Sequence, residues 1–402
     1  MPRKRLHQFF NFILITVVFV QGCIIVYLIG DRHHLNQLIT EQETLVLESG
    51  SAPSEATEYE AMQAVPSQPK AISDLKVTGW IPDWDFADGL TTLKSQADLF
   101  ASVSPFWFKL NRNGELETLA SAGDRQLSDY TRKNNLELIP TITSFESEEL
   151  SAILNNPEAM ARHIDAIMQA IQAGGYDGID LDYESISLAD KALFFEFLQK
   201  LSLRMKQQDK KLVFTAHPQW GKDVIYSELP QTRKVQDYKR IANWVDELRI
   251  MAYEYTGRDS PYYGPNAPLP WVEDILRYAI LAGVPREKLV LGISTYAYDY
   301  ARQETMPELD YYPVFNPEID ENDIAAAYYN NVVDKLKASN PFSEEFDSTW
   351  GEMVLRYKSG GRDRVIIYPN DQSIQLRKEL AANYGIRGVA YWRLGDEGSL
   401  QL

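Results

Sequence analysis

Short apolar segments alternate with longer amphipathic segments along most of the chain after about residue 75. The apolar segments have the length of buried strands, and the amphipathic ones repeat their apolar side chains at helical spacing. The expected strands are Val77–Ile81, Leu99–Phe108, Leu136–Thr143, Gly178–Tyr183, Leu212–Ala216, Glu247–Ala252, Leu289–Ser294 and Gly388–Tyr391. Strand and helix units repeated in this way predict an α/β fold, the (β/α)8 TIM barrel, with its site at the carboxyl ends of the strands.

Two helix starts can be read from capping residues. Asn156 precedes Pro157, which suits the first helical position, and Gly174 and Gly175 follow the last apolar position of that segment. The sequence from Ser187 to Asp190 has the form of a capping box before a second amphipathic helix. The interval from Tyr300 to about Arg364 is too long for one crossover helix, so we expect an insertion between barrel strands 7 and 8.

The amino-terminal region predicts a membrane anchor followed by a stalk. Basic residues at Arg3–Arg5 precede Phe9–Gly30, which runs 22 residues without a charge and is long enough to span a bilayer. Such an uncleaved signal-anchor places its amino end in the cytoplasm and the rest outside, in the periplasm or at the cell surface. A lipoprotein site at Cys23 and a cleaved signal peptide are the alternatives.

The expected division of the chain follows from this pattern. It comprises a cytoplasmic tail at 1–8, the transmembrane anchor at 9–30, a flexible linker at 31–73, rich in polar and acidic residues, and a barrel at 74–402. The barrel is expected to act as a monomer.

Composition narrows the possible functions. The net charge of -17 argues against binding to nucleic acid, and it favours a neutral or amide-decorated sugar polymer over a polyanion. The only cysteine is Cys23, so no intramolecular disulfide can form. Of the five histidines, His163 and His217 alone fall in the barrel region. A zinc site built on histidines is therefore not expected, and we expect no metal or organic cofactor.

Three acids share one face of an expected strand. In Gly178–Tyr183 and the residue after it, alternation places Asp180, Asp182 and Glu184 on one side and the apolar residues on the other. Neighbouring carboxylates in a poorly solvated site push at least one pKa upward, which keeps a carboxylic acid protonated near neutral pH. This is the requirement for a general acid in glycoside hydrolysis.

These acids have three alternative interpretations. A solvated acidic face conflicts with the apolar residues that alternate with the acids. A calcium loop would require glycine at the sixth position counted from Asp177, where the chain has Asp182. A buried structural network of acids remains possible. Asp177 falls off the shared face, so a structural role is favoured for it.

The motif formed by Asp177, Asp180, Asp182 and Glu184 resembles the signature of family 18 glycoside hydrolases, the chitinases and their relatives. Met251–Tyr255 is similar to the segment that ends the sixth barrel strand of that family, and Gly388–Trp392 to its eighth strand. Two further segments, Ala267–Val272 and Tyr384–Gly388, resemble the bacterial spore-cortex and cell-wall branch of N-acetylglucosaminidases. The resemblance covers roughly residues 76–397.

This resemblance implies a role for each matching residue. Glu184 would be the general acid, Asp182 would orient the substrate's acetamido group, and Tyr253 would bind the carbonyl oxygen of that group. Asp180 would share charge with Asp182, so that the two titrate jointly. In place of a second catalytic carboxylate, the acetamido group would then attack the anomeric carbon.

The resemblance also implies residues that bind sugar, namely Trp392, Met251 and the residue at position 254. The family usually has Asp there, and Glu254 is one methylene longer. Four more tryptophans fall at expected strand ends or in the following loops and together suggest an aromatic cleft: Trp80, Trp84, Trp107 and Trp220. His217 is expected to be a core histidine.

These expectations define one function and two alternatives. The chain is expected to be a membrane-anchored glycosidase that cleaves β-linked N-acetylglucosamine bonds with retention of configuration. Its partner would be a polysaccharide that contains N-acetylglucosamine, with peptidoglycan preferred over chitin oligomers. A non-catalytic sugar-binding protein on the same barrel and a membrane-tethered assembly factor are the alternatives.

Overall fold

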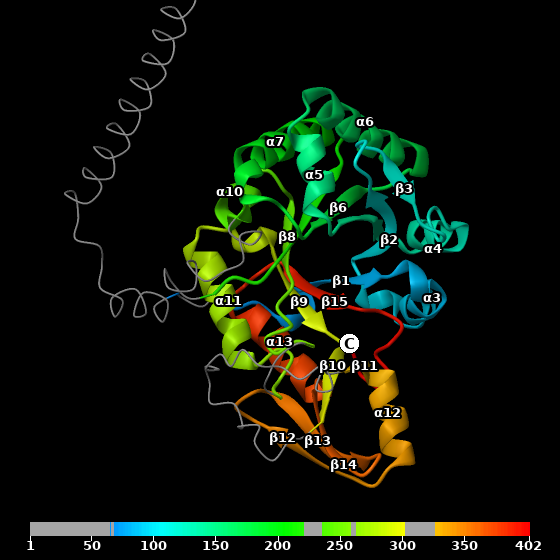
Figure 1. Ribbon diagram of the computed structural model, residues 1–402, viewed down its shortest axis with the longest axis vertical. Helices are drawn as coiled ribbons and strands as arrows, with labels where there is room; N and C mark the ends of the chain where they lie inside the picture. Colours follow the sequence, from blue (N-terminus) through cyan, green and yellow to red (C-terminus); the bar gives the residue numbers. More distant parts are fainter. Residues whose placement is uncertain (1–64, 66–67, 221–234, 259–262, 302–325) are drawn as a thin grey trace, which may run out of the picture. The chain divides into compact units, whose positions relative to one another are not determined.

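Eight parallel strands form a closed barrel in the computed structural model of the protein (Figure 1). The structure describes residues 65, 68–220, 235–258, 263–301 and 326–402. The barrel strands are β1 (Lys76–Ile81), β2 (Ser102–Leu110), β5 (Thr141–Ser144), β6 (Gly178–Tyr183), β7 (Lys211–Ala216), β8 (Glu247–Ile250), β9 (Leu289–Ser294) and β15 (Gly388–Trp392). The barrel is closed because β1 pairs with both β15 and β2. The predicted (β/α)8 barrel is confirmed.

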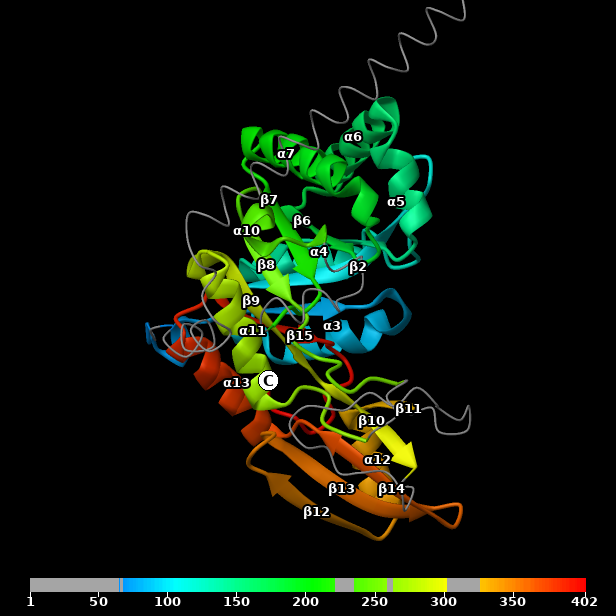
Figure 2. The ribbon, with the colours of Figure 1, turned by 60° about the vertical axis from the view of Figure 1, so that its left-hand side comes forward.

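Helices lie around the strands, as Figures 1 and 2 show from two directions. They are α3 (Phe86–Ser95), α4 (Arg125–Asn134), α5 (Ser147–Leu154), α6 (Pro157–Gly174), α7 (Lys191–Gln207), α10 (Tyr238–Ala242), α11 (Leu269–Leu281) and α13 (Asp371–Asn383). Short 3-10 helices cover Ile72–Asp74, Asp83–Asp85, Ala97–Leu99, Leu188–Asp190 and Arg286–Lys288. Two short strands pair with β2: β3 (Leu116–Thr118), which is antiparallel to it, and β4 (Glu137–Leu138), which is parallel.

An inserted antiparallel sheet follows β9, where the sequence predicted an insertion. Its strands run in the order β11, β10, β14, β13, β12, and helix α12 packs beside them (Figure 2). Their bounds are β10 (Tyr296–Ala301), β11 (Ala326–Tyr329), α12 (Asn330–Ser339), β12 (Phe342–Asp347), β13 (Glu352–Ser359) and β14 (Arg362–Tyr368). A buried ion pair between Glu352 of β13 and Arg377 of α13 joins the inserted sheet to the barrel.

Local signals in the sequence account for several boundaries. The Asn156 side chain accepts hydrogen bonds from two backbone N–H groups of α6, and Gly175 ends that helix with φ of 66°. The expected strand Leu136–Thr143 is divided into β4 and β5 around Pro140, which has no N–H to donate to a neighbouring strand.

The capping box expected at Ser187 is wrong. Helix α7 begins only at Lys191, after a 3-10 turn, and neither Ser187 nor Asp190 makes a side-chain cap. The carboxylate of Asp190 instead accepts hydrogen bonds from Ser151 and Asn155. This tertiary contact between α5 and the start of α7 replaces the local cap.

The amino-terminal tail, the expected anchor and nearly all of the linker lie outside the described residues. Among the residues that the structure describes, no helix combines the length and the apolar character needed to cross a bilayer.

Candidate active site

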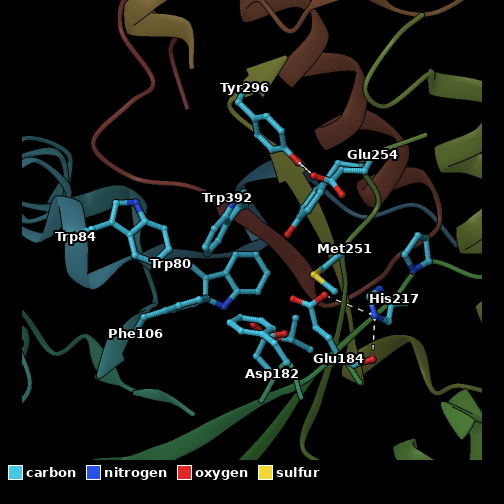
Figure 3. Close-up of a pocket in the computed structure, with 14 residues that line it drawn as sticks. Trp80, Trp84, Phe106, Asp182, Glu184, His217, Met251, Glu254, Tyr296 and Trp392 are labelled. Atoms are coloured by element: carbon cyan, nitrogen blue, oxygen red, sulfur yellow. Dashed lines mark hydrogen bonds and ion pairs between the residues drawn. The ribbon is translucent and has the colours of Figure 1, made fainter. Parts of the chain in front are cut away.

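A pocket opens at the carboxyl ends of the barrel strands, where a TIM barrel carries its site (Figure 3). Its cavity volume is about 230 Å³. The residues that line it come from seven barrel strands or the loops after them and from the inserted sheet. They are Trp80, Trp84, Phe106, Phe145, Asp182, Glu184, Thr215, His217, Pro218, Met251, Tyr253, Glu254, Tyr296 and Trp392.

Strand β6 positions the three acids by simple alternation. Asp180 and Asp182 are buried inside the barrel, whereas the side chain of Glu184, just beyond the strand, is 31% exposed at the pocket. On the opposite face, Tyr183 packs against the outer helices, and its hydroxyl lies 2.7 Å from Nε2 of His163. The acids therefore run from the barrel interior toward the open end, with Glu184 in the outermost position.

Asp180 lies below the pocket in a network of donors. Its Oδ2 accepts a hydrogen bond of 2.9 Å from the Trp80 indole, and its Oδ1 accepts one of 2.9 Å from the Thr215 hydroxyl. The guanidinium of Arg249, fully buried in the barrel, forms an ion pair of 3.3 Å with the same carboxylate. These contacts give both carboxylate oxygens of Asp180 a donor, and Asp180 is not among the residues that line the cavity.

Asp182 has the opposite electrostatic environment. Burial raises its pKa well above the ordinary value, and the negative charges of Glu184 and Asp180 raise it further. Its Oδ1 is buried and has no hydrogen-bond partner among the described residues. A buried acceptor that lines a cavity and lacks a partner is suited to receive a donor from a ligand.

Tyr253 follows β8 and is nearly fully buried at the pocket. Burial raises the pKa of its hydroxyl well above the usual range, and the carboxylates of Asp182, Glu184 and Glu254 add to this effect. The hydroxyl therefore stays protonated and can donate a hydrogen bond to a carbonyl oxygen.

Glu254 is fixed in place by the inserted sheet. Its Oε1 accepts hydrogen bonds of 2.7 Å from the hydroxyls of both Tyr296 and Tyr298 on β10. Its N–H donates to Oδ1 of Asn266, and its φ of 66° is uncommon for a residue with a side chain. Backbone strain of this kind persists only where surrounding contacts impose it.

His217 lines the pocket beside the proposed acid, and this corrects its expected place in the core. Its side chain is 16% exposed, and Nε2 lies 3.6 Å from Oε2 of Glu184 and 3.2 Å from the Glu184 carbonyl oxygen (Figure 3). His217 lies two residues beyond Thr215, which also lines the pocket, so alternation continued past the end of β7 is the signal that the sequence interpretation did not use.

Aromatic rings form one side of the pocket. The rings of Trp392 and Phe106 have centroids 5.0 Å apart, and Trp80 and Trp84 contact Trp392 edge-on at 6.2 and 6.5 Å. Trp84 is 63% exposed, so its ring extends the apolar surface toward the solvent. Met251 also lines the cavity.

Three residues considered from the sequence lie elsewhere. Trp107 is fully buried on the outer side of β2 and packs against Tyr176, so it does not line the pocket. Trp220 packs against Trp271. The carboxylate of Asp177 accepts a hydrogen bond from the backbone of Leu138, which agrees with a structural role.

The sequence interpretation missed Phe106, Phe145, Thr215 and Tyr296 as lining residues. The error at Trp107 and the omission of Phe106 have a common cause. The pairing of β2 with β5 shifts register between Phe106 and Phe108, so simple alternation cannot say which side chain faces inward. For Tyr296, the alternating tyrosines at positions 296, 298 and 300 are a signal for one face of a strand, although the partner Glu254 is remote in the sequence.

No group of three or more histidine, cysteine, aspartate or glutamate side chains suited to a metal ion occurs within the described ranges.

The model of the family "Glycosyl hydrolases family 18" matches residues 38–397. The chain belongs to this family and is a glycosidase. The predicted family is therefore confirmed.

Similar proteins include enzymes of Bacillus species. The chain is 26% identical over 310 residues to the putative sporulation-specific glycosylase YdhD of Bacillus subtilis, an alignment that covers 75% of this chain and 67% of the relative. It is 26% identical over 301 residues to the cortical fragment-lytic enzyme of the same organism, covering 73% of this chain and 64% of that enzyme. The crystal structure of the spore cortex-lytic enzyme SleL of Bacillus megaterium shares the fold, with a TM-score of 0.68 and 21% identity over 80% of this chain and 70% of that one.

Proposed function

We propose that the protein hydrolyses β-linked N-acetylglucosamine bonds in a surface polysaccharide by a substrate-assisted mechanism with retention of configuration. The observation that carries this proposal is Oδ1 of Asp182, which has no hydrogen-bond partner among the described residues and belongs to a side chain that lines the cavity together with Glu184 and Tyr253. An acetamido group bound there would give Asp182 an N–H donor and would offer its carbonyl oxygen to the Tyr253 hydroxyl.

In the first step, Glu184 donates its proton to the glycosidic oxygen while the acetamido carbonyl oxygen attacks the anomeric carbon. The bond to the leaving sugar breaks, and an oxazolinium ion forms within the reacting sugar. Positive charge then develops on the acetamido nitrogen. That charge favours the ionised form of Asp182 and so opposes the effect of burial on its pKa.

In the second step, water attacks the anomeric carbon and gives a proton to the Glu184 carboxylate. The acetamido group is released, and the acid is protonated for the next cycle. Two displacements at the same carbon return the original configuration. Tyr253 donates a hydrogen bond to the acetamido oxygen, which holds this group in the attacking position.

The charge of the site supports a neutral sugar. Three acidic side chains line the cavity, and no lysine or arginine is among its described lining residues. The aromatic side formed by Trp392, Trp84 and Phe106 provides apolar surface for a sugar ring. Peptidoglycan or a related surface glycan is the preferred substrate, since two bacterial relatives are named for cortex or sporulation, and chitin oligomers are second.

We also propose that Phe9–Gly30 anchors the protein in a membrane with the barrel outside the cytoplasm. Its support is the uncharged length of the segment and the basic residues before it. The full-length protein should remain with membranes after carbonate extraction and retain its amino terminus. A mature protein that starts at a lipid-modified Cys23, or beyond Gly30, would contradict this proposal.

A panel of substrates tests the proposed activity. The full-length protein in mild detergent is incubated with peptidoglycan, chitin oligomers and an N-acetyl-free β-glucan, and the products are identified by mass. Cleavage of the first two with new N-acetylglucosamine reducing ends supports the proposal. Cleavage of the glucan alone, or of none of the three, would contradict it.

A further inference from the structure

Asn266 contacts both members of a residue pair at the pocket. Its Oδ1 accepts a hydrogen bond of 2.7 Å from the backbone N–H of Glu254, and its Nδ2 donates one of 2.9 Å to the backbone carbonyl of Tyr296. The side chains of Glu254 and Tyr296 both line the cavity and are hydrogen-bonded to each other. The Asn266 amide, which belongs to a fully buried residue, therefore joins the backbones of two residues whose side chains already meet at the site.

Only one orientation of the Asn266 amide satisfies both contacts. A backbone N–H can only donate a hydrogen bond, and a carbonyl oxygen can only accept one. The amide oxygen must therefore face Glu254, and the amide nitrogen must face Tyr296. The contact to Tyr296 on the inserted sheet thus fixes the direction of the acceptor that Asn266 presents to Glu254.

The segment that carries Asn266 is held by contacts of its own backbone. The carbonyl oxygen of Asn266 accepts a hydrogen bond of 2.8 Å from the N–H of Tyr255. The carbonyl of the next residue, Ala267, accepts one from Arg377, which forms the buried ion pair with Glu352 of the inserted sheet. These contacts do not use the Asn266 side chain, so they should persist when that side chain is shortened.

The backbone of Glu254 requires support of this kind. Its φ of 66° lies in the left-handed region, which is unfavourable for a residue with a side chain unless surrounding contacts impose it. In this conformation the exposed carboxylate lines the cavity, and the hydroxyls of Tyr296 and Tyr298 bind the same oxygen, Oε1. Within the described residues Oε2 accepts no hydrogen bond, so it can accept one from a hydroxyl of a bound sugar.

We propose that Asn266 is a positioning residue that holds Glu254 in its left-handed backbone conformation and so directs the Glu254 carboxylate toward the bound sugar. This inference rests on the proposed function, because it gives Glu254 a contact to the sugar that the site would cleave. Asn266 itself is not among the residues that line the cavity. Its effect on the kinetics should therefore pass through Glu254.

A double-mutant cycle tests whether Asn266 acts through Glu254. The wild type, Asn266→Ala, Glu254→Ala and the double variant are compared on a chitin oligomer. N266A should lower the kcat/KM of the wild type on the order of 10–10²-fold, because a small displacement of a positioned group can cost this much. The same substitution should change the kcat/KM of E254A by less than about twofold. Equal fold losses in the two backgrounds would overturn the proposal, since independent effects multiply.

Asn330→Ala is the matched control. Asn330 is also buried, and its amide donates a hydrogen bond of 2.8 Å to a backbone carbonyl, that of Pro369. It neither lines the cavity nor contacts Glu254. N330A should keep kcat/KM within about twofold of the wild-type value. A loss in N330A as large as that in N266A would overturn the proposal, because the cause would then be the loss of a buried amide rather than the position of Glu254.

A second measurement needs no substrate. Hydrogen exchange of single backbone amides is followed by mass spectrometry in the full-length wild type and in N266A. The Glu254 N–H loses its acceptor in N266A and should exchange about tenfold faster or more, whereas the Tyr255 N–H keeps the backbone carbonyl of residue 266 and should keep its rate. An unchanged rate at Glu254, or the same acceleration at both amides, would overturn the inference. Because this readout is independent of hydrolysis, it separates a failure of Asn266 to position Glu254 from a failure of the proposed function.

Discussion

The hydroxyl of Tyr296 on the inserted sheet lies 2.7 Å from Oε1 of Glu254, which follows barrel strand β8. Tyr298, two residues further along β10, donates to the same oxygen at 2.7 Å. The longer side chain at position 254 thus reaches two donors that belong to the insertion. The insertion therefore contributes to the site both by lining the cavity and by fixing one of its acids.

Loss of one of these donors should weaken catalysis without altering the cavity lining. Tyr298 does not line the cavity, so Tyr298→Phe removes a hydrogen bond to a carboxylate, an interaction of about 1.5–3 kcal/mol. We expect kcat/KM to fall roughly tenfold or more, as measured with a chitin oligomer. The matched control is Tyr300→Phe, because the Tyr300 hydroxyl donates to the carbonyls of Thr256 and Gly257 and not to the Glu254 carboxylate. Equal kcat/KM values for Y298F and the wild type would show that fixing the Glu254 carboxylate does not contribute to catalysis.

Asp182→Asn tests the substrate-assisted mechanism. The amide cannot carry the negative charge that offsets the developing oxazolinium ion, so turnover should fall on the order of 10²–10⁴-fold. A thiazoline analogue of the cyclised intermediate should inhibit the wild type far more strongly than the substrate binds. A second substrate carries a hydroxyl in place of the N-acetyl group on the reacting sugar. If the wild type cleaves it as fast as the N-acetyl substrate, the acetamido group cannot be the nucleophile. Asp182 would then have to act as a base or a nucleophile.

His163 predicts how stability depends on pH. Burial lowers its pKa to about 4, although the ring lies 3.1 Å from the carbonyl of Gly114 and 2.7 Å from the Tyr183 hydroxyl. The unfolded chain takes up this proton near pH 6.5 and the folded chain only near pH 4, so the folded state loses stability as pH falls between these values. The loss should be on the order of 3 kcal/mol in urea unfolding.

The control for this prediction is His163→Gln, which cannot titrate. Its free energy of unfolding should change less between pH 7 and pH 4.5 than that of the wild type, even if its stability at pH 7 is lower. A wild type and H163Q with the same pH dependence would show that another group is responsible.

Substitutions of Trp392 and Trp107, which the sequence analysis both assigned to sugar binding, should have different effects. Trp392→Ala removes a ring that lines the cavity, so KM should rise about tenfold, which corresponds to about 1.4 kcal/mol of binding. Trp107 lies in the layer between β2 and the outer helices. Trp107→Phe should therefore lower the midpoint of thermal unfolding and leave KM unchanged. A larger effect of W107F than of W392A on KM would contradict the assignment.

The barrel fold and the inward direction of the acids on β6 could be predicted from the sequence, because both depend on local patterns. Alternation along Gly178–Tyr183 places Asp180 and Asp182 inward, and β6 and β9 have the bounds expected. Asn156, Pro157 and Gly175 mark the ends of α6 by short-range capping. These features depend on residues that are neighbours in the chain.

Other parts of the site depend on contacts between distant residues. His217 lies beyond the end of β7, and its partner Glu184 is 33 residues away in the sequence. Tyr298 reaches Glu254 across 44 residues and through an inserted sheet whose topology the sequence did not reveal. Arg249 falls within the expected strand Glu247–Ala252, and only the fold shows that it is fully buried as the partner of Asp180.

The most direct test of the central claim compares wild type with Glu184→Gln on an N-acetylglucosamine oligomer, with products followed by mass and binding measured separately. The account predicts cleavage by the wild type, a loss of turnover on the order of 10²–10⁴-fold in E184Q, and retained binding of the oligomer by E184Q. Equal, nonzero turnover in the two proteins would contradict the assignment of Glu184 as the general acid.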